Sequence, residues 1–319
     1  MKTICICIVT YRAPELTIQC LKSLEPELAS LPGSRVRLVE NGSADGSLEK
    51  IAAAIKASGW SSWVDLIEAP GNRGFAFGNN VAIRAERACG RAADYLMLLN
   101  PDTVARPGAI RALFDFLESH PQIGIVGGRS EDPDGTPQHC CFRFPGLIDE
   151  FAQYLRLGLF DRVFAHWITR LPIRDEPHEV GWLSGASVMM RGSLVDQIGL
   201  MDEHYFLYFE ETDFLLRATR AGWLIWHVPQ SRIIHYVGQT TGVTKRGERL
   251  PRRPSYWFES RRRYFASNYG RAYAVLADLC AMAGVISWKL RTWLERKTDY
   301  DPPHLLGDYW RHSALWKSG

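Results

Sequence analysis

The stretch TICICIVT, residues 3–10, decides the fold class, because it is a continuous apolar run without a polar face. A run of this kind is typical of a strand buried on both sides inside a parallel sheet. Residues 14–31 then predict a helix, with Pro14 near its start and Gly33 beyond its end. A buried strand followed by a helix is the repeating unit of an α/β fold.

The same alternation continues along the first 130 or so residues. Further strands are predicted at 35–40, 64–68, 94–99 and 123–128, and helices at 47–58, 78–91 and 107–120. The chain is therefore predicted to be α/β, with a mostly parallel nucleotide-binding sheet flanked by helices. Later elements are predicted as a helical insertion at 146–180, strands at 182–191 and 223–228, a helix at 212–221, and a C-terminal helical extension.

Charge is unevenly distributed over the 319 residues, whose net charge is only +3. Residues 245–297 carry 13 Lys and Arg against 4 Asp and Glu, a net +9, which leaves the rest at −6. We therefore expect a catalytic domain at 1–240 and a basic helical extension at 241–319, joined by a hinge at 247–254. An anionic partner, such as a membrane surface, fits the extension.

The extension also carries an apolar helical stripe, formed by Val275, Leu279, Met282, Ile286, Leu290 and Trp293. This stripe either docks on the catalytic domain or lies at a membrane interface through 255–297. No secretory signal and no uninterrupted apolar run of about 18 residues is found. The seven cysteines, odd in number and without C-x-x-C spacing, favour reduced thiols in a cytoplasmic protein over zinc or disulfides.

Ligands of open α/β sheets gather at the carboxyl ends of the strands, which directs attention to three places. These are Thr10-Tyr11, Glu40-Asn41 and Asn100-Pro101-Asp102. The first turn is TYRAPE and lacks G-x-G-x-x-G, so a nicotinamide oxidoreductase is disfavoured.

Asp102 can hold Mg²⁺ or Mn²⁺ at the sheet edge, although a helix-capping role fits it equally well. His235 ends a short apolar strand; it is either a core histidine or a further metal ligand. The glycine- and asparagine-rich loop at 71–80 precedes a helix, whose free N–H groups can bind an anion.

The stretch FLYFEETD, residues 206–213, places Glu210, Glu211 and Asp213 behind an aromatic run. One carboxylate would suffice to cap the following helix. Three close carboxylates raise one another's pKa, which favours a general base among them.

Seven stretches in this order resemble the family 2 glycosyltransferases, which are inverting, nucleotide-sugar-dependent enzymes of the glycosyltransferase A fold. The likeness is closest to the bacterial rhamnosyltransferase branch that builds polysaccharides, such as lipopolysaccharide, on lipid carriers. The matching stretches are IVTYR (8–12), VENGSADGS (39–47), GNRGFAFGNN (71–80), LLNPDT (98–103), WLSGASVMMR (182–191), FLYFEETDFLLRATRAGW (206–223) and IIHYVGQ (233–239).

The resemblance implies a role for each stretch. The catalytic residues would be Glu211, with Asp213 and Glu210 beside it, and the metal ligands Asp102 and His235. The nucleotide-sugar donor would meet Thr10, Tyr11, Arg12, Glu40, Asn41, Gly74, Asn79, Asn100 and Asp102, and the acceptor Trp182, Ser184 and Gly185. Glu stands at position 40 and at the base position 211, where the family usually has Asp, so Asp213 is an alternative base.

The expected reaction is one in-line displacement that transfers a sugar from a nucleotide diphosphate to a saccharide or lipid-linked saccharide acceptor, with Mg²⁺ or Mn²⁺ as cofactor. The branch implies L-rhamnose from dTDP-rhamnose. Three alternatives stay open: a UDP- or other nucleotide-sugar donor, a sugar-1-phosphate nucleotidyltransferase, and a catalytically dead binding relative. Nucleic acid is not expected as a partner, because the basic run at 261–263 adjoins an aromatic helix.

Overall fold

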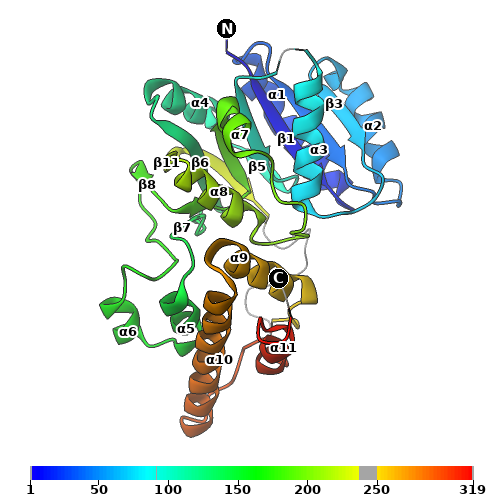
Figure 1. The fold of residues 1–319 in the computed structure, drawn as a ribbon. Coiled ribbons are helices and arrows are strands. Elements are labelled where there is room, and N and C mark those ends of the chain that lie inside the picture. The colour runs from blue at the N-terminus through cyan, green and yellow to red at the C-terminus, as the bar shows by residue number, and fades with distance from the viewer. Residues whose placement is uncertain (1, 91, 237–249, 318–319) are drawn as a thin grey trace. The chain divides into compact units, whose positions relative to one another are not determined.

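The computed structural model describes residues 2–90, 92–236 and 250–317, which form two compact units (Figure 1). The sheet unit comprises residues 1–142, 172–206 and 210–240; the helical unit comprises 143–171, 207–209 and 241–319. Each unit has a core of its own. The predicted division into 1–240 and 241–319 stays a prediction. The predicted hinge lies partly outside the described residues, since only 250–254 of it is described.

The first half of the sheet unit is parallel. β1 (Ile4–Thr10), β2 (Arg35–Glu40), β3 (Val64–Glu68) and β4 (Tyr95–Leu99) lie in the order β3-β2-β1-β4. Thr10 is in register with Glu40, so the carboxyl ends of these strands meet at one edge. Every residue of β1 is buried, as the continuous apolar run predicts.

The second half of the sheet is mixed. β10 (Ser187–Arg191) lies antiparallel between β4 and β6 (Ile123–Glu131), and β11 (Leu224–His235) runs parallel to β6. The short strands β5 (Thr103–Ala105) and β8 (His178–Glu179) both pair antiparallel with β11. β7 (Cys141–Phe142) and β9 (Trp182–Leu183) form a separate two-stranded sheet.

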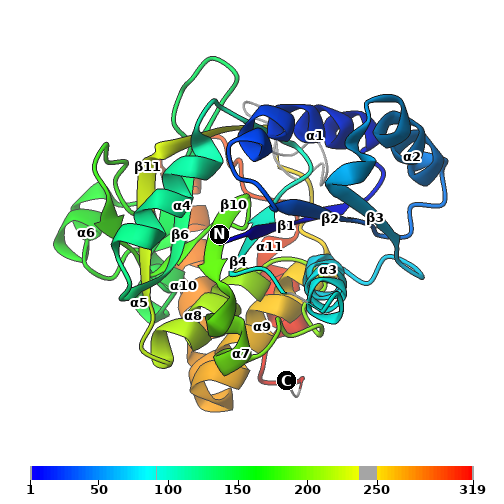
Figure 2. The same ribbon diagram turned by 90° about the horizontal axis from the view of Figure 1, so that it is seen from above.

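Helices cover both faces of this sheet (Figure 2). One face carries α1 (Pro14–Ala29), α2 (Ser47–Ala57) and α4 (Ala109–Ser119), and the 3-10 turn η1 (Trp60–Ser62) follows α2. The other face carries α3 (Phe75–Ala88), α7 (Gly192–Ile198) and α8 (Glu210–Arg220). Apolar side chains of α1, α2 and α4 fill the core on their face of the sheet, around β1 and β4.

Several predicted boundaries were wrong, each for a local reason. The helix predicted at 78–91 begins at Phe75, because Gly74 at φ +95° ends the loop before it. The predicted strand 182–191 is two strands, β9 and β10, separated by residues 184–186. The predicted strand 223–228 continues to His235, because a register shift between Val228 and Arg232 accommodates Pro229.

The helical unit consists of α5 (Leu147–Leu155), α6 (Gly158–Val163), α9 (Ser255–Tyr269), α10 (Arg271–Leu294) and α11 (Leu305–His312). Its apolar core includes Phe258 and Tyr309. At its centre the buried Arg261 guanidinium donates to Glu150 at 2.9 Å and to Asp278 at 2.5 Å. Because these charges are buried together, removal of Arg261 would leave two carboxylates buried without a compensating positive charge.

The exposed side of α10 is apolar. Its small residues Ala274, Ala277 and Ala281 are buried, whereas the predicted stripe is largely exposed: Leu290 is 55% and Trp293 75% accessible. No membrane-spanning helix is expected from the sequence, because no apolar run reaches about 18 residues without interruption. By length and composition, α10 could cross a membrane. Buried Asp278 instead fits a helix that is packed on one side.

Candidate active site

The acidic pair lies on the first turn of α8. Glu210 is 3% accessible and Glu211 is half-buried. The two residues before them, Tyr208 and Phe209, have φ values of +71° and +67°, which bulky residues rarely adopt. Backbone strain of this kind is common at functional sites, where the surrounding structure holds it in place.

Burial and mutual repulsion set the protonation of this pair. Burial raises the pKa of the Glu210 carboxyl well above its ordinary value, and the charge of Glu211 raises it further. Burial also raises the pKa of Glu211, although the backbone at Gly185 offsets part of this effect. Glu211 Oε2 is buried and has no hydrogen-bond partner among the described residues, so this oxygen has an unused acceptor position.

Asp213, the third carboxylate, has partners of its own. It accepts from Arg217 Nε at 3.0 Å, and the Tyr205 hydroxyl lies 3.4 Å from it. Arg217 also donates to the carbonyls of Ile198 and Leu200. Asp213 thus fastens α8 to the segment that precedes it.

Asp102 and His235 meet at the edge of the sheet. Asp102 follows β4 directly, and antiparallel pairing of β5 with β11 sets Thr103 opposite His235. His235 Nε2 lies 3.4 Å from Asp102 Oδ1 and 3.5 Å from Asn100 Nδ2. The Asp102 carboxylate is almost fully buried, and the His235 side chain is 13% accessible.

The turn at 184–186 connects this pair with the acidic helix. Asn100 donates its N–H to Ala186 O at 3.1 Å. On the other side of the turn, a Cβ added at Gly185 would lie 4.0 Å from Glu211 Oε1. Asn100 and Glu211, which are far apart in the sequence, therefore both border this turn, and His235 lies next to Asn100.

Trp182 and Ser184 flank this turn at β9. The Trp182 ring stacks on Phe142 with centroids 4.4 Å apart, and Ser184 donates its N–H to Cys140 O. Their position beside Gly185 fits the predicted acceptor wall, a role that stays a prediction.

The strand ends after β1 and β2 form one connected turn. Asn41 donates its N–H to Thr10 O at 2.8 Å, and Arg12 donates its N–H to Ser43 Oγ at 2.8 Å. Glu40 accepts from the Ser43 N–H and hydroxyl. No role for Ser43 is predicted from the sequence, although Ser43 lies within the matching stretch VENGSADGS.

The side chains of these residues differ in what they offer to a ligand. The Thr10 hydroxyl pairs with Thr17, and Glu40 stabilises its own turn. Arg12 is exposed and stacks over the half-buried Tyr11 ring at 5.1 Å. Arg12 and Tyr11 are therefore the two that face solvent at this strand end.

Gly74 brings the glycine-rich loop against the chain that leads to the acidic pair. Phe75 donates its N–H to Phe206 O at 2.9 Å, and a Cβ at Gly74 would lie only 2.1 Å from the same oxygen. Asn41 Nδ2 donates to Gly74 O from the neighbouring turn. Asn79 is fully buried and donates to Phe75 O within α3.

A divalent cation fits the Asp102–His235 pair. The donor set is one carboxylate oxygen and one imidazole nitrogen, which suits Mn²⁺ well and leaves positions for phosphate oxygens and water. The fit depends on the observed 3.4 Å separation of Oδ1 and Nε2, which places both donors toward one point.

Comparisons with known proteins give matches to a single family. The model of the glycosyltransferase like family 2 matches residues 2–270. An N-acetylglucosaminyl-diphospho-decaprenol L-rhamnosyltransferase of Mycobacterium tuberculosis is 34% identical over 235 residues, covering 69% of this chain and 73% of that protein. Rhamnosyltransferase WbbL of Escherichia coli is 26% identical over 168 residues, covering 51% and 61%.

The solved structure of mannosyltransferase PcManGT from Pyrobaculum calidifontis, in complex with GDP-Man and Mn²⁺, matches 92% of this chain and 74% of its own. Its TM-score is 0.56 at 14% sequence identity. The predicted α/β fold of the glycosyltransferase A type and the predicted family resemblance are thereby confirmed.

Proposed function

This chain belongs to glycosyltransferase family 2, and we propose that it transfers L-rhamnose from dTDP-rhamnose, with inversion, to a lipid-linked saccharide in the synthesis of a cell-surface polysaccharide. The sugar and the acceptor class are supported by the 34% identity to an enzyme named as an L-rhamnosyltransferase of a diphospho-decaprenol-linked sugar. The observation that supports the mechanism is that Glu211 and Asn100 border the turn 184–186, and that Asn100 lies beside the Asp102–His235 pair.

Glu211 is the proposed general base. Its Oε2 removes the proton of the acceptor hydroxyl as that oxygen attacks the anomeric carbon. The raised pKa of Glu210 favours its protonated form, which reduces the negative charge beside Glu211. The backbone at Gly185 favours the charged form of Glu211, whose Oε1 lies beside that glycine. A base with a pKa above that of an ordinary glutamate binds the proton more readily.

Asp213 is the proposed positioning residue rather than the base. Its carboxylate is engaged by Arg217 at 3.0 Å, and Arg217 in turn holds two backbone carbonyls. This network fixes α8, and with it the direction in which Glu211 points.

Asp102 and His235 are the proposed ligands of Mg²⁺ or Mn²⁺. When bound, such an ion neutralises the charge that develops on the leaving nucleoside diphosphate. Asn100 Nδ2 lies 3.5 Å from His235 Nε2, and this contact would be given up when Nε2 binds the ion. Arg12, exposed at the first strand end, and the loop at Gly74 are proposed to meet the nucleotide part of the donor.

The helical unit is proposed to bring the enzyme to the cytoplasmic face of a membrane as a peripheral protein. The exposed stripe of α10, with Leu290 and Trp293, would lie in the interface, and the positive charges of 255–297 would meet anionic lipid. Sedimentation with anionic liposomes tests this contact. The double variant Leu290→Gln, Trp293→Gln should no longer bind the liposomes. The control Ile173→Gln, which changes an exposed residue of the sheet unit, should bind them like the wild type.

The transfer itself is tested with Glu211→Gln. The variant keeps the shape of the side chain but accepts no proton, so transfer should fall by about 10²- to 10⁴-fold while nucleotide binding persists. A rate near that of the wild type would remove Glu211 as base. Comparing dTDP-rhamnose with UDP-sugars in the same assay decides the donor, and the absence of any transfer or donor hydrolysis by the wild type would leave the binding-only alternative.

A further inference from the structure

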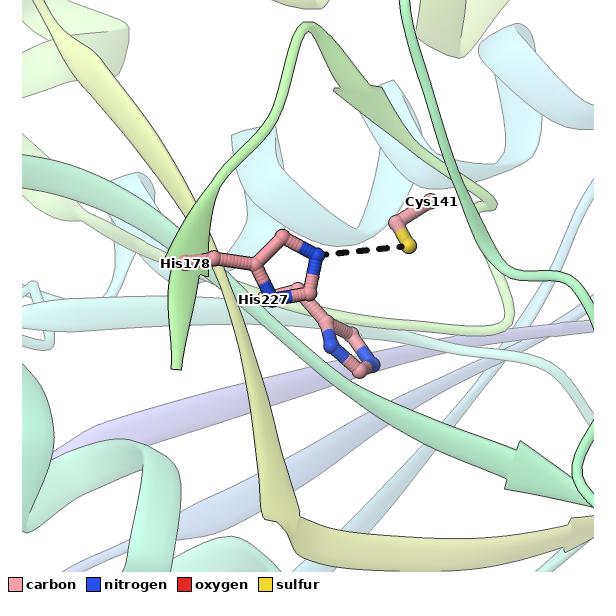
Figure 3. A group of neighbouring side chains, drawn as sticks. All are labelled: Cys141, His178 and His227. Carbon is pink, nitrogen blue, oxygen red and sulfur yellow. Dashed lines mark hydrogen bonds between the residues drawn. The ribbon is translucent and has the colours of Figure 1, made fainter. Parts of the chain in front are cut away.

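A second cluster of metal-ligating side chains lies in the sheet unit, apart from the acidic pair and the Asp102–His235 pair. Cys141, His178 and His227 come from β7, β8 and β11, and their ligand atoms all lie within 4.8 Å of one another (Figure 3). We propose that this cluster binds Zn²⁺, and that the neighbouring Cys140, which is not part of the three-residue group but has its thiol 3.5 Å from His227 Nε2, supplies the fourth ligand.

The distances are close to those of a tetrahedral site. Cys141 Sγ lies 4.0 Å from His178 Nε2, and Cys140 Sγ lies 3.5 Å from His227 Nε2. Zn–S and Zn–N bonds of about 2.3 and 2.0 Å at tetrahedral angles separate sulfur from nitrogen by about 3.6 Å. Both sulfur–nitrogen separations are therefore within about 0.4 Å of the value for two ligands of one ion.

The His178 imidazole is oriented for metal binding by a hydrogen bond of its other ring nitrogen. His178 Nδ1 lies 2.8 Å from Glu176 O, to which it donates its N–H, and this leaves the Nε2 lone pair facing Cys141. A backbone carbonyl on the non-ligating nitrogen is the usual support of a metal-bound histidine. His227 is 3% accessible, and its Nδ1 has no hydrogen-bond partner among the described residues.

The pairing of the strands creates the cluster. His227 stands directly opposite His178 in the β11–β8 pair, and the ring centroids lie 5.2 Å apart. Cys140 and Cys141 are both buried. Two thiolates and two neutral imidazoles give a Zn²⁺ site of zero net charge, which burial favours. On binding, each thiol loses its proton to solvent.

The position of the cluster indicates a structural role. The chain leaves the sheet unit after Phe142 and returns to it at Pro172. Zn²⁺ would join the departing segment at Cys141 and the returning segment at His178 to the core strand β11. Spacing in the sequence did not predict this, because the ligands lie on three strands and contain no C-x-x-C pair; the expectation of reduced thiols without zinc is the alternative.

The test is metal binding by the intact chain, purified with a non-thiol reductant and equilibrated with Zn²⁺ in excess Mg²⁺. We expect one tightly bound zinc per chain, and Co²⁺ in its place should give the thiolate-to-cobalt charge-transfer band and the intense visible bands of a tetrahedral site. The charge-transfer band distinguishes this site from Asp102–His235, which has no sulfur.

His178→Ala and Cys141→Ser should each lower zinc affinity by more than the roughly 10- to 100-fold that loss of a supporting contact costs. His178 lies on the two-residue edge strand β8, so its loss should leave the fold intact, as circular dichroism would check. The matched controls His166→Ala and Cys89→Ser change exposed residues and should keep wild-type affinity. Absence of bound zinc in the wild type, or wild-type affinity in both cluster variants, would overturn the proposal.

Discussion

Gly74→Ala tests whether the glycine-rich loop positions the acidic helix. Gly74 has φ +95°, and an added Cβ would lie 2.1 Å from Phe206 O, far inside van der Waals contact. That oxygen also accepts from the Phe75 N–H at 2.9 Å, so the two segments have no room to separate without losing a backbone hydrogen bond. Phe206 precedes the acidic pair by four residues.

The magnitude has two parts. A side chain at φ +95° and ψ 178°, a region that is almost restricted to glycine, costs about 1–3 kcal/mol, and the overpacking adds about 1–3 kcal/mol. The free energy of unfolding should therefore fall by about 2–6 kcal/mol. If the strain is relieved by moving the 206 segment by about 1 Å, the transfer rate should fall by about 10²-fold as well.

The matched control is Gly222→Ala, because Gly222 has nearly the same φ, +92°, with nothing within 4 Å of an added Cβ. Gly222 lies just beyond the end of α8, the helix that carries the acidic pair. The free energy of unfolding of Gly222→Ala should fall by only about 1–2 kcal/mol, with little change in transfer rate. Urea unfolding and initial-rate assays of both variants give the comparison. Equal losses of stability in the two variants, with wild-type transfer by Gly74→Ala, would refute the reasoning.

Three further predictions concern charge. Asp102→Asn should weaken Mn²⁺ binding in the presence of nucleoside diphosphate by at least about 10-fold, as measured by calorimetry. The transfer rate should fall on acidification through the raised pKa of Glu211, because the base must be deprotonated, and the Glu211→Asp variant should shift that acidic limb in a pH–rate profile. Arg261→Met should lower the free energy of unfolding by about 3–5 kcal/mol in urea titration, since it leaves two buried carboxylates without their cation.

The pH dependence of stability should change with Glu210→Gln. Burial and Glu211 raise the Glu210 pKa in the folded state, so the folded protein binds this proton more tightly than the unfolded chain does. The resulting stabilisation is fully present below the unfolded pKa and is lost as pH rises through the folded one. The melting temperature of Glu210→Gln, relative to that of the wild type, should therefore increase as the pH rises. A difference in melting temperature that stays constant between about pH 5 and pH 8 would contradict this.

Local pattern was sufficient for the parts of the fold that depend on local burial. β1 is apolar throughout because both of its faces are covered, and the family resemblance followed from the strand ends. β5 was missed because its three residues are held in place by pairing with the distant residues 233–235. Pro229 hid the length of β11, since only the partner strand β6 reveals the register shift around it.

The candidate site shows the same limit. The residue types at 102, 211 and 235 were visible in the sequence, but the contact of Asp102 with His235 depends on the β5–β11 pairing, which joins distant segments. Asp213 resembled an alternative base until its ion pair with Arg217 was seen. The Cys141–His178–His227 cluster had no signal in the sequence, because three separate strands contribute to it.

The most direct test of the central claim is an anomalous difference map at the manganese edge, from crystals soaked with Mn²⁺ and a nucleoside diphosphate. We expect a manganese peak within bonding distance of Asp102 Oδ1 and His235 Nε2. Phosphate oxygens should complete the coordination of the ion, and the Glu211 carboxylate should face the same pocket. A manganese peak on other residues, or a diphosphate bound away from the turn at 184–186, would contradict it.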